Sequence, residues 1–142
     1  MLVLDTNVIS EAMRGREADP RVLTWLRSLP AIPVTTVVNR AEIMAGIALL
    51  PAGAKRERLR AAAAMAFAGL GVTLPFVPEA ADAYADIVAT RRGLGRPIGA
   101  MDALVAAICR VSGASLATRD VGDFEGLGLT LENPWELSAN PS

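Results

Sequence analysis

Short apolar segments alternate with longer segments of helical character along the whole chain. The segments that read as buried strands are MLVL at 1–4, IPVTT at 32–36, residues 72–77, SLAT at 115–118 and residues 128–131. The segments that read as helices run from 6 or 7 toward 13 and over 19–29, 37–50, 53–68, 79–92 and 99–112. Strands that are separated by helices favour parallel pairing. The pattern therefore predicts an α/β sandwich with a mainly parallel central sheet.

Local signals set several of the predicted boundaries. Thr6 or Asn7 can cap the first helix, and Asp19 followed by Pro20 is typical of a helix start. The stretch RRGLGRP at 91–97 reads as a loop before the last long helix. The chain has 142 residues, which is the usual size of one domain.

The composition excludes several classes of enzyme. The chain contains no His, and Cys109 is its only cysteine. Serine-hydrolase triads, Cys-His proteases, disulfides and most zinc sites are therefore excluded. Any acid-base or metal chemistry must rest on carboxylates.

Net charge and targeting signals indicate which partners and which cellular location to expect. The net charge is −1, so no global field favours nucleic acid or membrane. No basic segment precedes an apolar one at the start, and AAAAMAFAGLGV at 61–72 is too short to span a bilayer. We therefore expect a cytoplasmic location.

Four of the fifteen acids stand in apolar surroundings. Asp5 and Asp120 directly follow predicted strands, and Glu42 and Asp102 lie within the apolar helices AEIMAGIALL and IGAMDALVAAIC. An ionised carboxylate in a dry core is costly unless it is paired or bound to a metal. Since sites in parallel α/β sheets form at the carboxyl ends of strands, these four side chains are expected to share one crevice.

Four converging carboxylates cannot all stay ionised without a cation. Oxygen ligands select hard ions such as Mg²⁺ or Mn²⁺. A water on such an ion is a nucleophile suited to phosphodiester hydrolysis.

Each acid also has a purely structural interpretation. Asp5 is a possible helix cap, Glu42 a partner for Arg40 or Arg110, Asp102 a cap of its helix, and Asp120 a turn residue in RDVGD. The metal interpretation rests on the four together.

The same segments give the chain a resemblance to a known family. LDTNVIS, AEIMAGIALLP, IGAMDALVAAIC, LATRDVGDFEGLGL and NPW, in this order, resemble a PIN domain of the VapC/FitB-like toxins. The resemblance covers residues 1–135 and leaves 136–142 as a C-terminal tail. It implies a three-layer α/β/α sandwich and the toxin of a toxin–antitoxin pair, a ribonuclease that depends on one or two Mg²⁺ or Mn²⁺ ions.

The resemblance also implies roles for particular residues and partners. The family's acidic quartet falls on Asp5, Glu42, Asp102 and Asp120, and its polar support positions fall on Thr6, Asn7 and Thr118. The implied partners are an RNA substrate, a second copy of the chain and an antitoxin, in a heterotetramer or a larger assembly. The antitoxin's C-terminal segment is expected to cover the acidic groove.

Two positions leave the assignment open. TRDVGDF carries both Asp120 and Asp123, and we favour Asp120 as the closer ligand, with Asp123 supporting it or sharing a second metal. Arg40 stands two residues before Glu42, where a small or apolar residue is less surprising, and we interpret it as a surface charge.

Arginines flank the predicted crevice. Lys55 is the only lysine among fourteen basic residues, and the rest are Arg, whose planar fork suits phosphate. The candidates for contact with RNA phosphates are Arg14, Arg91, Arg92 and Arg96, and the alternative for each is a solvated loop. Aromatic residues are scarce, which disfavours base stacking.

Two functions of different classes remain. The first is an endoribonuclease toxin that cleaves RNA with metal-activated water at Asp5, Glu42, Asp102 and Asp120. The alternative is a catalytically silent PIN-like module that binds its antitoxin and metal without cutting RNA.

Overall fold

All strand pairings are parallel in the computed structural model, which describes residues 1–136. The strands are β1 (Leu2–Leu4), β2 (Thr35–Thr36), β3 (Thr73–Leu74), β4 (Ser115–Ala117) and β5 (Leu131–Glu132). β4 lies between β1 and β5, and β2 pairs with β3. A parallel bridge between Val3 and Val34 joins the two groups. The spatial order is therefore β5-β4-β1-β2-β3.

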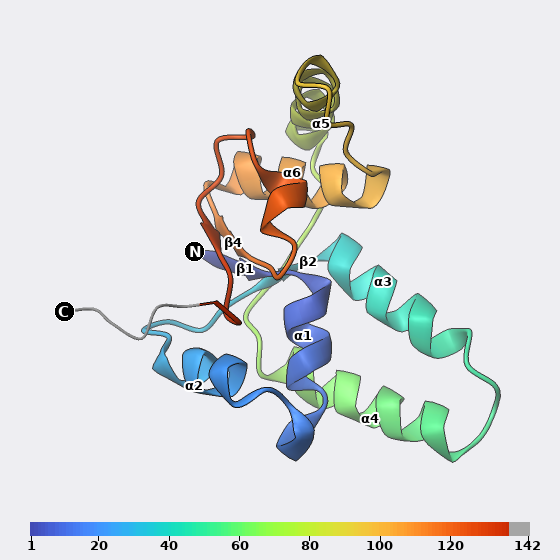
Figure 1. Cartoon of the computed structure of the whole chain (residues 1–142). Helices are drawn as coiled ribbons and strands as arrows, with labels where there is room; N and C mark the ends of the chain where they lie inside the picture. Colours follow the sequence, from blue (N-terminus) through green and yellow to red (C-terminus); the bar gives the residue numbers. More distant parts are fainter. Residues whose placement is uncertain (137–142) are drawn as a thin grey trace.

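Helices cover both faces of this sheet. They are α1 (Thr6–Ala12), α2 (Pro20–Ser28), α3 (Val37–Ala48), α4 (Ala54–Ala68), α5 (Pro78–Gly93) and α6 (Ala100–Ser112), with short 3₁₀ helices η1 (Gly15–Glu17) and η2 (Val121–Phe124). Figure 1 shows α5 and α6 on one side of the strands, and α1, α2 and α4 on the other. The predicted three-layer α/β/α sandwich is confirmed.

Alternate side chains of the strands enter two separate cores. Val3 and Leu116, both fully buried, pack into the cluster that α5 and α6 complete. Their neighbours Leu4 and Ala117 point the opposite way and pack with α1 and α2. This alternation is the period of a β-strand, and it fixes the register of β1 against β4, with Val3 opposite Leu116.

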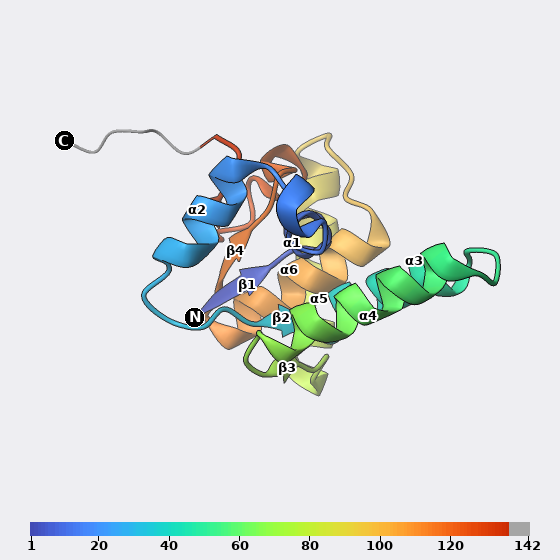
Figure 2. The ribbon, with the colours of Figure 1, turned by 90° about the horizontal axis from the view of Figure 1, so that it is seen from below.

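The parallel arrangement brings the starts of several elements to one edge of the sheet. α1 leaves β1 and α3 leaves β2 without a loop, and η2 follows soon after β4. α3 and α4 lie side by side and extend away from the strands (Figures 1 and 2). The candidate site lies where the chain leaves the carboxyl ends of β1, β2 and β4.

The structure corrects three local predictions. Asp5 caps α1 in place of Thr6 or Asn7, because its Oδ1 accepts the Thr6 N–H. β5 is Leu131–Glu132, so only the last residue of the segment predicted at 128–131 belongs to the strand. α5 continues to Gly93, so the first three residues of RRGLGRP are helical.

Two further predictions concern the C-terminal tail and the possibility of a membrane-spanning helix. Of the predicted tail at 136–142, all but Glu136 lies outside the described residues. Among the described helices, none combines the length and the apolar character that a bilayer crossing requires.

Candidate active site

Asp5 lies at the centre of a buried hydrogen-bond network. Only 6% of the residue is exposed, because it sits between β1 and α1 under the start of α3. Its Oδ1 accepts from the Thr6 N–H and from Asn39 Nδ2, both at 2.9 Å. Its Oδ2 accepts from the Thr118 hydroxyl at 2.7 Å. All of these donors are neutral, so the network orients the carboxylate without neutralising it.

Burial raises the pKa of Asp5 above its usual value of 3.8. The hydrogen bonds from Thr118, Thr6 and Asn39 oppose this effect, and the nearby charge of Asp120 adds to it. Desolvation therefore outweighs three donated hydrogen bonds. A positive ion bound at Asp5 would favour the ionised carboxylate and lower this pKa.

Glu42 reaches the same network from α3. Its Oε1 accepts from the Thr6 hydroxyl at 2.9 Å, and that hydroxyl accepts from Asn39 Nδ2 at 3.1 Å. The alternative of an ion pair to Arg40 or Arg110 is wrong. The Arg40 guanidinium lies over the Phe67 ring at 4.6 Å from its centroid, and Arg110 pairs with Asp86 at 2.6 Å.

Asp120 lies at the exposed side of the network. It precedes η2, so its interpretation as a turn residue is correct and is compatible with a place at the site. Its Oδ2 accepts from Asn7 Nδ2 at 3.1 Å, and its N–H donates to the Thr118 hydroxyl at 3.0 Å. Asn7 Oδ1 also accepts the Arg119 N–H at 3.2 Å. Asn7 and Thr118 thus hold the segments after β1 and β4 together.

Asp102 enters from the first turn of α6, where Gly99 occupies the cap position. Burial is the largest cause that raises the pKa of Asp102, and the charges of Asp5, Asp123, Glu42 and Asp120 follow in that order; together they bring it to about 6. The fields of all the other candidate acids therefore meet at this half-buried carboxyl group. Asp102 is not a simple cap of its helix.

The site concentrates negative charge, and its carboxylates form no ion pair with Arg or Lys side chains of residues 1–136. Within residues 1–136, none of the ion pairs involves Asp5, Glu42, Asp102, Asp120 or Asp123. No three acidic or cysteine side chains of that range converge closely enough to form a ready-made metal cage. The donor set is nevertheless all oxygen and strongly anionic, which fits a hard divalent ion that keeps several of its waters.

Sequence reasoning missed Asn39. This residue is fully buried in the first turn of α3, and its Nδ2 donates to both Asp5 and Thr6. Its Oδ1 accepts from the Thr36 hydroxyl at 2.7 Å. The signal was the pair TT at a strand end followed three residues later by an amide, which is a capping pattern.

The arginine candidates have different surroundings. Arg91 is only 4% exposed and its guanidinium donates to main-chain carbonyl groups, so it is not available to RNA and that prediction is wrong. Arg96 is exposed but pairs with Glu125 at 3.1 Å. Arg92 is exposed on α5. Arg14 is largely exposed and pairs with Glu11 at 3.0 Å.

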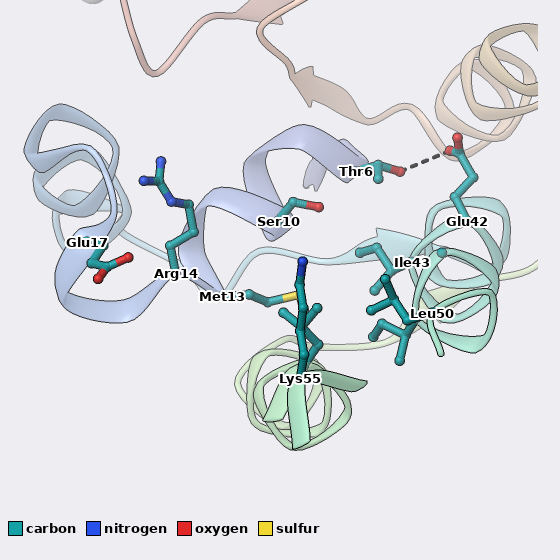
Figure 3. A pocket seen from close by; sticks show the side chains of 12 residues that line it. Thr6, Ser10, Met13, Arg14, Glu17, Glu42, Ile43, Leu50 and Lys55 are labelled. Atoms are coloured by element: carbon teal, nitrogen blue, oxygen red, sulfur yellow. Dashed lines mark hydrogen bonds between the residues drawn. The ribbon is translucent and has the colours of Figure 1, made fainter. Parts of the chain in front are cut away.

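A groove of about 510 Å³ leads away from Glu42 and Thr6. Its floor is apolar, with side chains such as Met13 just after α1, Ile43 in α3 and Leu50 just after α3. Figure 3 shows Arg14, between α1 and η1, and Lys55 on α4 bordering it, with the ammonium group of Lys55 directed toward α1. The groove is thus lined by two cations, Arg14 and Lys55, and by two carboxylates, Glu42 and Glu17.

Comparisons with known proteins agree with this architecture. Residues 2–127 match the model of the PIN domain family. The chain is 39% identical over 141 residues to the VapC ribonuclease Y4jK of Sinorhizobium fredii, covering 96% of this chain and 99% of the relative. It is 38% identical over 140 residues to the toxin FitB of Neisseria gonorrhoeae, covering 95% and 99%.

A solved structure extends the likeness to three dimensions. A FitAB complex bound to an IR36 DNA fragment contains a chain that superposes with a TM-score of 0.84 at 36% identity, covering 99% of this chain and all of that one. Sequence and fold agree over nearly the full length of both chains. The chain therefore belongs to the PIN-domain family and, within it, to the VapC/FitB-like toxins.

Proposed function

We propose that this chain is a divalent-metal-dependent endoribonuclease and the toxin of a toxin–antitoxin pair. The observation that carries the proposal is the set of carboxylates without ion pairs among residues 1–136 that surround Asp102, whose pKa is raised to about 6 by burial and by their charges. The likeness to a protein named VapC ribonuclease supports RNA as the substrate class.

The proposed ligands of one or two Mg²⁺ or Mn²⁺ ions are Asp5, Glu42, Asp102 and Asp120, with Asp123 as a further member. Such an ion supplies a polarised water as nucleophile and charge neutralisation for the phosphodiester group. The protein's own part is to orient oxygen atoms. Thr6, Asn7, Asn39 and Thr118 hold three of the carboxylates by donated hydrogen bonds, and they do so without adding positive charge.

The groove beside Glu42 is the proposed path of the RNA strand. A single strand carries its charge on the phosphates, and Arg14 and Lys55 line the groove at positions where they would attract them. The apolar floor offers contact area for riboses and bases. Arg92 and Arg96 remain proposed phosphate contacts at the opposite side of the acids.

The partners belong to the same proposal. The related chains were solved as FitAB and VapBC complexes, some of them bound to DNA. We accordingly propose an antitoxin that covers the acidic groove, a homodimer of this chain within a heterotetramer or larger assembly, and a cytoplasmic location. The PIN domain is proposed to span residues 1–135.

The test is RNA cleavage by purified protein that has been freed of antitoxin and supplied with Mn²⁺. We expect cleavage by the parent chain and its loss in Asp5→Asn. The matched control is Asp82→Asn, an exposed acid on α5 that lies outside the site. Undiminished cleavage by Asp5→Asn would exclude the assignment.

A second measurement separates the alternative function. Calorimetric titration of the same protein with Mn²⁺ reports binding without RNA. Stoichiometric binding without cleavage would identify a silent module that binds metal and antitoxin.

A further inference from the structure

Arg91 is a buried cation with no carboxylate partner among residues 1–136. It lies in the last turn of α5, and its guanidinium crosses to the segment that follows Asp120. Nε donates to the carbonyl oxygen of Arg96 at 2.7 Å. Nη1 donates to the carbonyl oxygens of Asp123 and, at 3.4 Å, of Glu125. A buried charge that is satisfied by carbonyl groups is a costly arrangement, and it fixes the position of every group that it contacts.

Arg96 strengthens the same attachment from outside. Its Nη2 donates to the carbonyl oxygen of Gly122 at 2.9 Å, and its Nη1 contacts Glu125 at 3.1 Å. The two arginines also fix each other, because the Arg96 N–H donates to the Arg91 carbonyl at 3.0 Å while Arg91 Nε bonds the Arg96 carbonyl. The end of α5 is thereby tied to the backbone of residues 122–125.

The backbone just beyond η2 is also packed closely against α5. Gly126 has a φ of +83°, and a Cβ atom there would lie 3.0 Å from Leu94 Cδ1. The segment from Gly122 to Gly126 thus follows the contour of the α5 end. Arg91 contacts the middle of this segment.

The two acids of TRDVGDF are held by different means. Asp120 is fixed from the segments that follow β1 and β4, through Asn7 Nδ2 and the Thr118 hydroxyl. The side chain of Asp123 makes no hydrogen bond within the described residues, and it is exposed. The position of its backbone is set by the Arg91 donor at its own carbonyl, and by its N–H to the Asp120 carbonyl at 3.0 Å. Its charge reaches the site nevertheless, since it is the second-largest like-charge influence on the pKa of Asp102.

We propose that Arg91 is a positioning residue of the metal site, which sets the place of Asp123 by holding the main chain of η2. The inference rests on the proposed function, and it assigns Asp123 to the site as a group that depends on Arg91. Asp120 is held independently of the Arg91 hydrogen bonds, because its partners are Asn7 in α1 and Thr118 after β4.

The chemistry of the clamp requires arginine. Three carbonyl oxygens are reached by donors at two positions of one planar group, while a lysine offers a single ammonium. Arg91→Lys should therefore fail to restore what Arg91→Ala removes. Arg110 provides the matched control, because it also bridges two elements and donates to a carbonyl group, that of Leu127 at 3.0 Å, at a distance from the acids.

The experiment measures Mn²⁺ affinity by calorimetry, without RNA and well below the melting temperature of each variant. Arg91→Ala and Arg91→Lys are expected to weaken binding by roughly ten-fold or more, the usual effect of removing a group that orients a ligand. Arg110→Ala should lower the melting temperature and leave the affinity unchanged. Asp123→Asn should also weaken binding, and Arg91→Ala should add little in that background.

Two results would overturn the inference. The first is parental Mn²⁺ affinity in Arg91→Ala. The second is an equal loss of Mn²⁺ affinity when Arg91→Ala is introduced into the parent chain and into Asp123→Asn. Such a result would show that Arg91 has a general structural role and does not act through Asp123. Should Arg91→Ala fail to fold, Arg96→Ala removes the exposed half of the clamp and is expected to act in the same direction with a smaller loss.

Amide hydrogen exchange distinguishes failure of this inference from failure of the proposed function. Residues 121–126 should exchange faster in metal-free Arg91→Ala than in Arg110→Ala. If the parent chain bound no Mn²⁺ at all, the proposed function would fail, and exchange in this segment would still decide whether Arg91 holds it.

Discussion

The Thr118 hydroxyl donates to Asp5 Oδ2 at 2.7 Å, although 113 positions separate the two residues in the chain. The contact exists because β1 and β4 pair in register and end together. Thr118 is fully buried, and the same oxygen accepts the Asp120 N–H. One hydroxyl therefore aligns two of the proposed metal ligands.

Replacing Thr118 by Val removes this hydroxyl and keeps the shape of the side chain. The pKa of Asp5 should rise further, because the hydrogen bond from Thr118 is the strongest influence that lowers it. We expect Mn²⁺ affinity and RNA cleavage to fall by roughly 10 to 100-fold. Thr118→Ser keeps the donor and should retain most of both. Equal losses in the two variants would show that packing, and not the hydrogen bond, is responsible.

Replacing Asn39 by Ala is expected to lower the free energy of unfolding. The amide is fully buried, and its loss removes one of the two hydrogen bonds that Asp5 Oδ1 accepts and leaves the Thr36 hydroxyl hydrogen without an acceptor. An unpaired buried polar group costs about 1–3 kcal/mol, and urea denaturation measures the sum. Arg40→Ala, at the next position of α3, removes only the stacking on Phe67 and should cost less than about 1 kcal/mol.

The stability of the metal-free protein should depend on Asp102. Its pKa is about 6 in the folded chain, against 3.8 for an unperturbed group, so the folded state binds more protons between these values. The free energy of unfolding should therefore fall as the pH rises from about 4 to about 6. Thermal melts in a chelator would show this decline, and Asp102→Asn should flatten it.

Divalent metal should reverse that dependence. An ion favours the ionised carboxylates, so Mn²⁺ is expected to raise the melting temperature more at pH 7 than at pH 5. A shift that is equal at both pH values would contradict the assignment of Asp102 as a ligand.

Removing the groove cations should weaken RNA binding without changing the chemical step. Lys55→Ala and Arg14→Ala are expected to raise KM for RNA and leave kcat unaltered, because both lie along the groove and away from Asp5. Each should also reduce the slope of log affinity against log salt by roughly 0.7. Arg58→Ala, exposed on the same helix α4 outside the groove, is the control. A large loss of kcat in Lys55→Ala would show that the residue acts in catalysis.

The acidic residues of the candidate site were visible in the sequence because their neighbours are apolar. Asp5, Glu42 and Asp102 interrupt segments that otherwise belong in a core, and a parallel sheet gathers strand ends at one edge. The alternation of strands and helices likewise predicted the layers of the fold. In both cases the information is local and needs no knowledge of which residues pair.

Asn39 and Arg91 show what was not predicted. Both are polar residues that stand directly before exposed arginines, Arg40 and Arg92. Their burial follows from packing, since Asn39 lies against Asp5 and Arg91 against the backbone of η2. Long-range hydrogen bonds of this kind leave no periodicity in the sequence.

The pairing of β1 with β4 bears on when the protein can become active during its synthesis. The partner of Asp5, Thr118, and the carboxylate of Asp120 are made more than a hundred residues after Asp5. Contacts between such distant segments form late, after the intervening chain has been made. A nascent chain that has not yet extended to residue 120 therefore carries no complete site. For a protein proposed to cut RNA, this order of assembly delays activity until the chain has been almost fully translated through this domain.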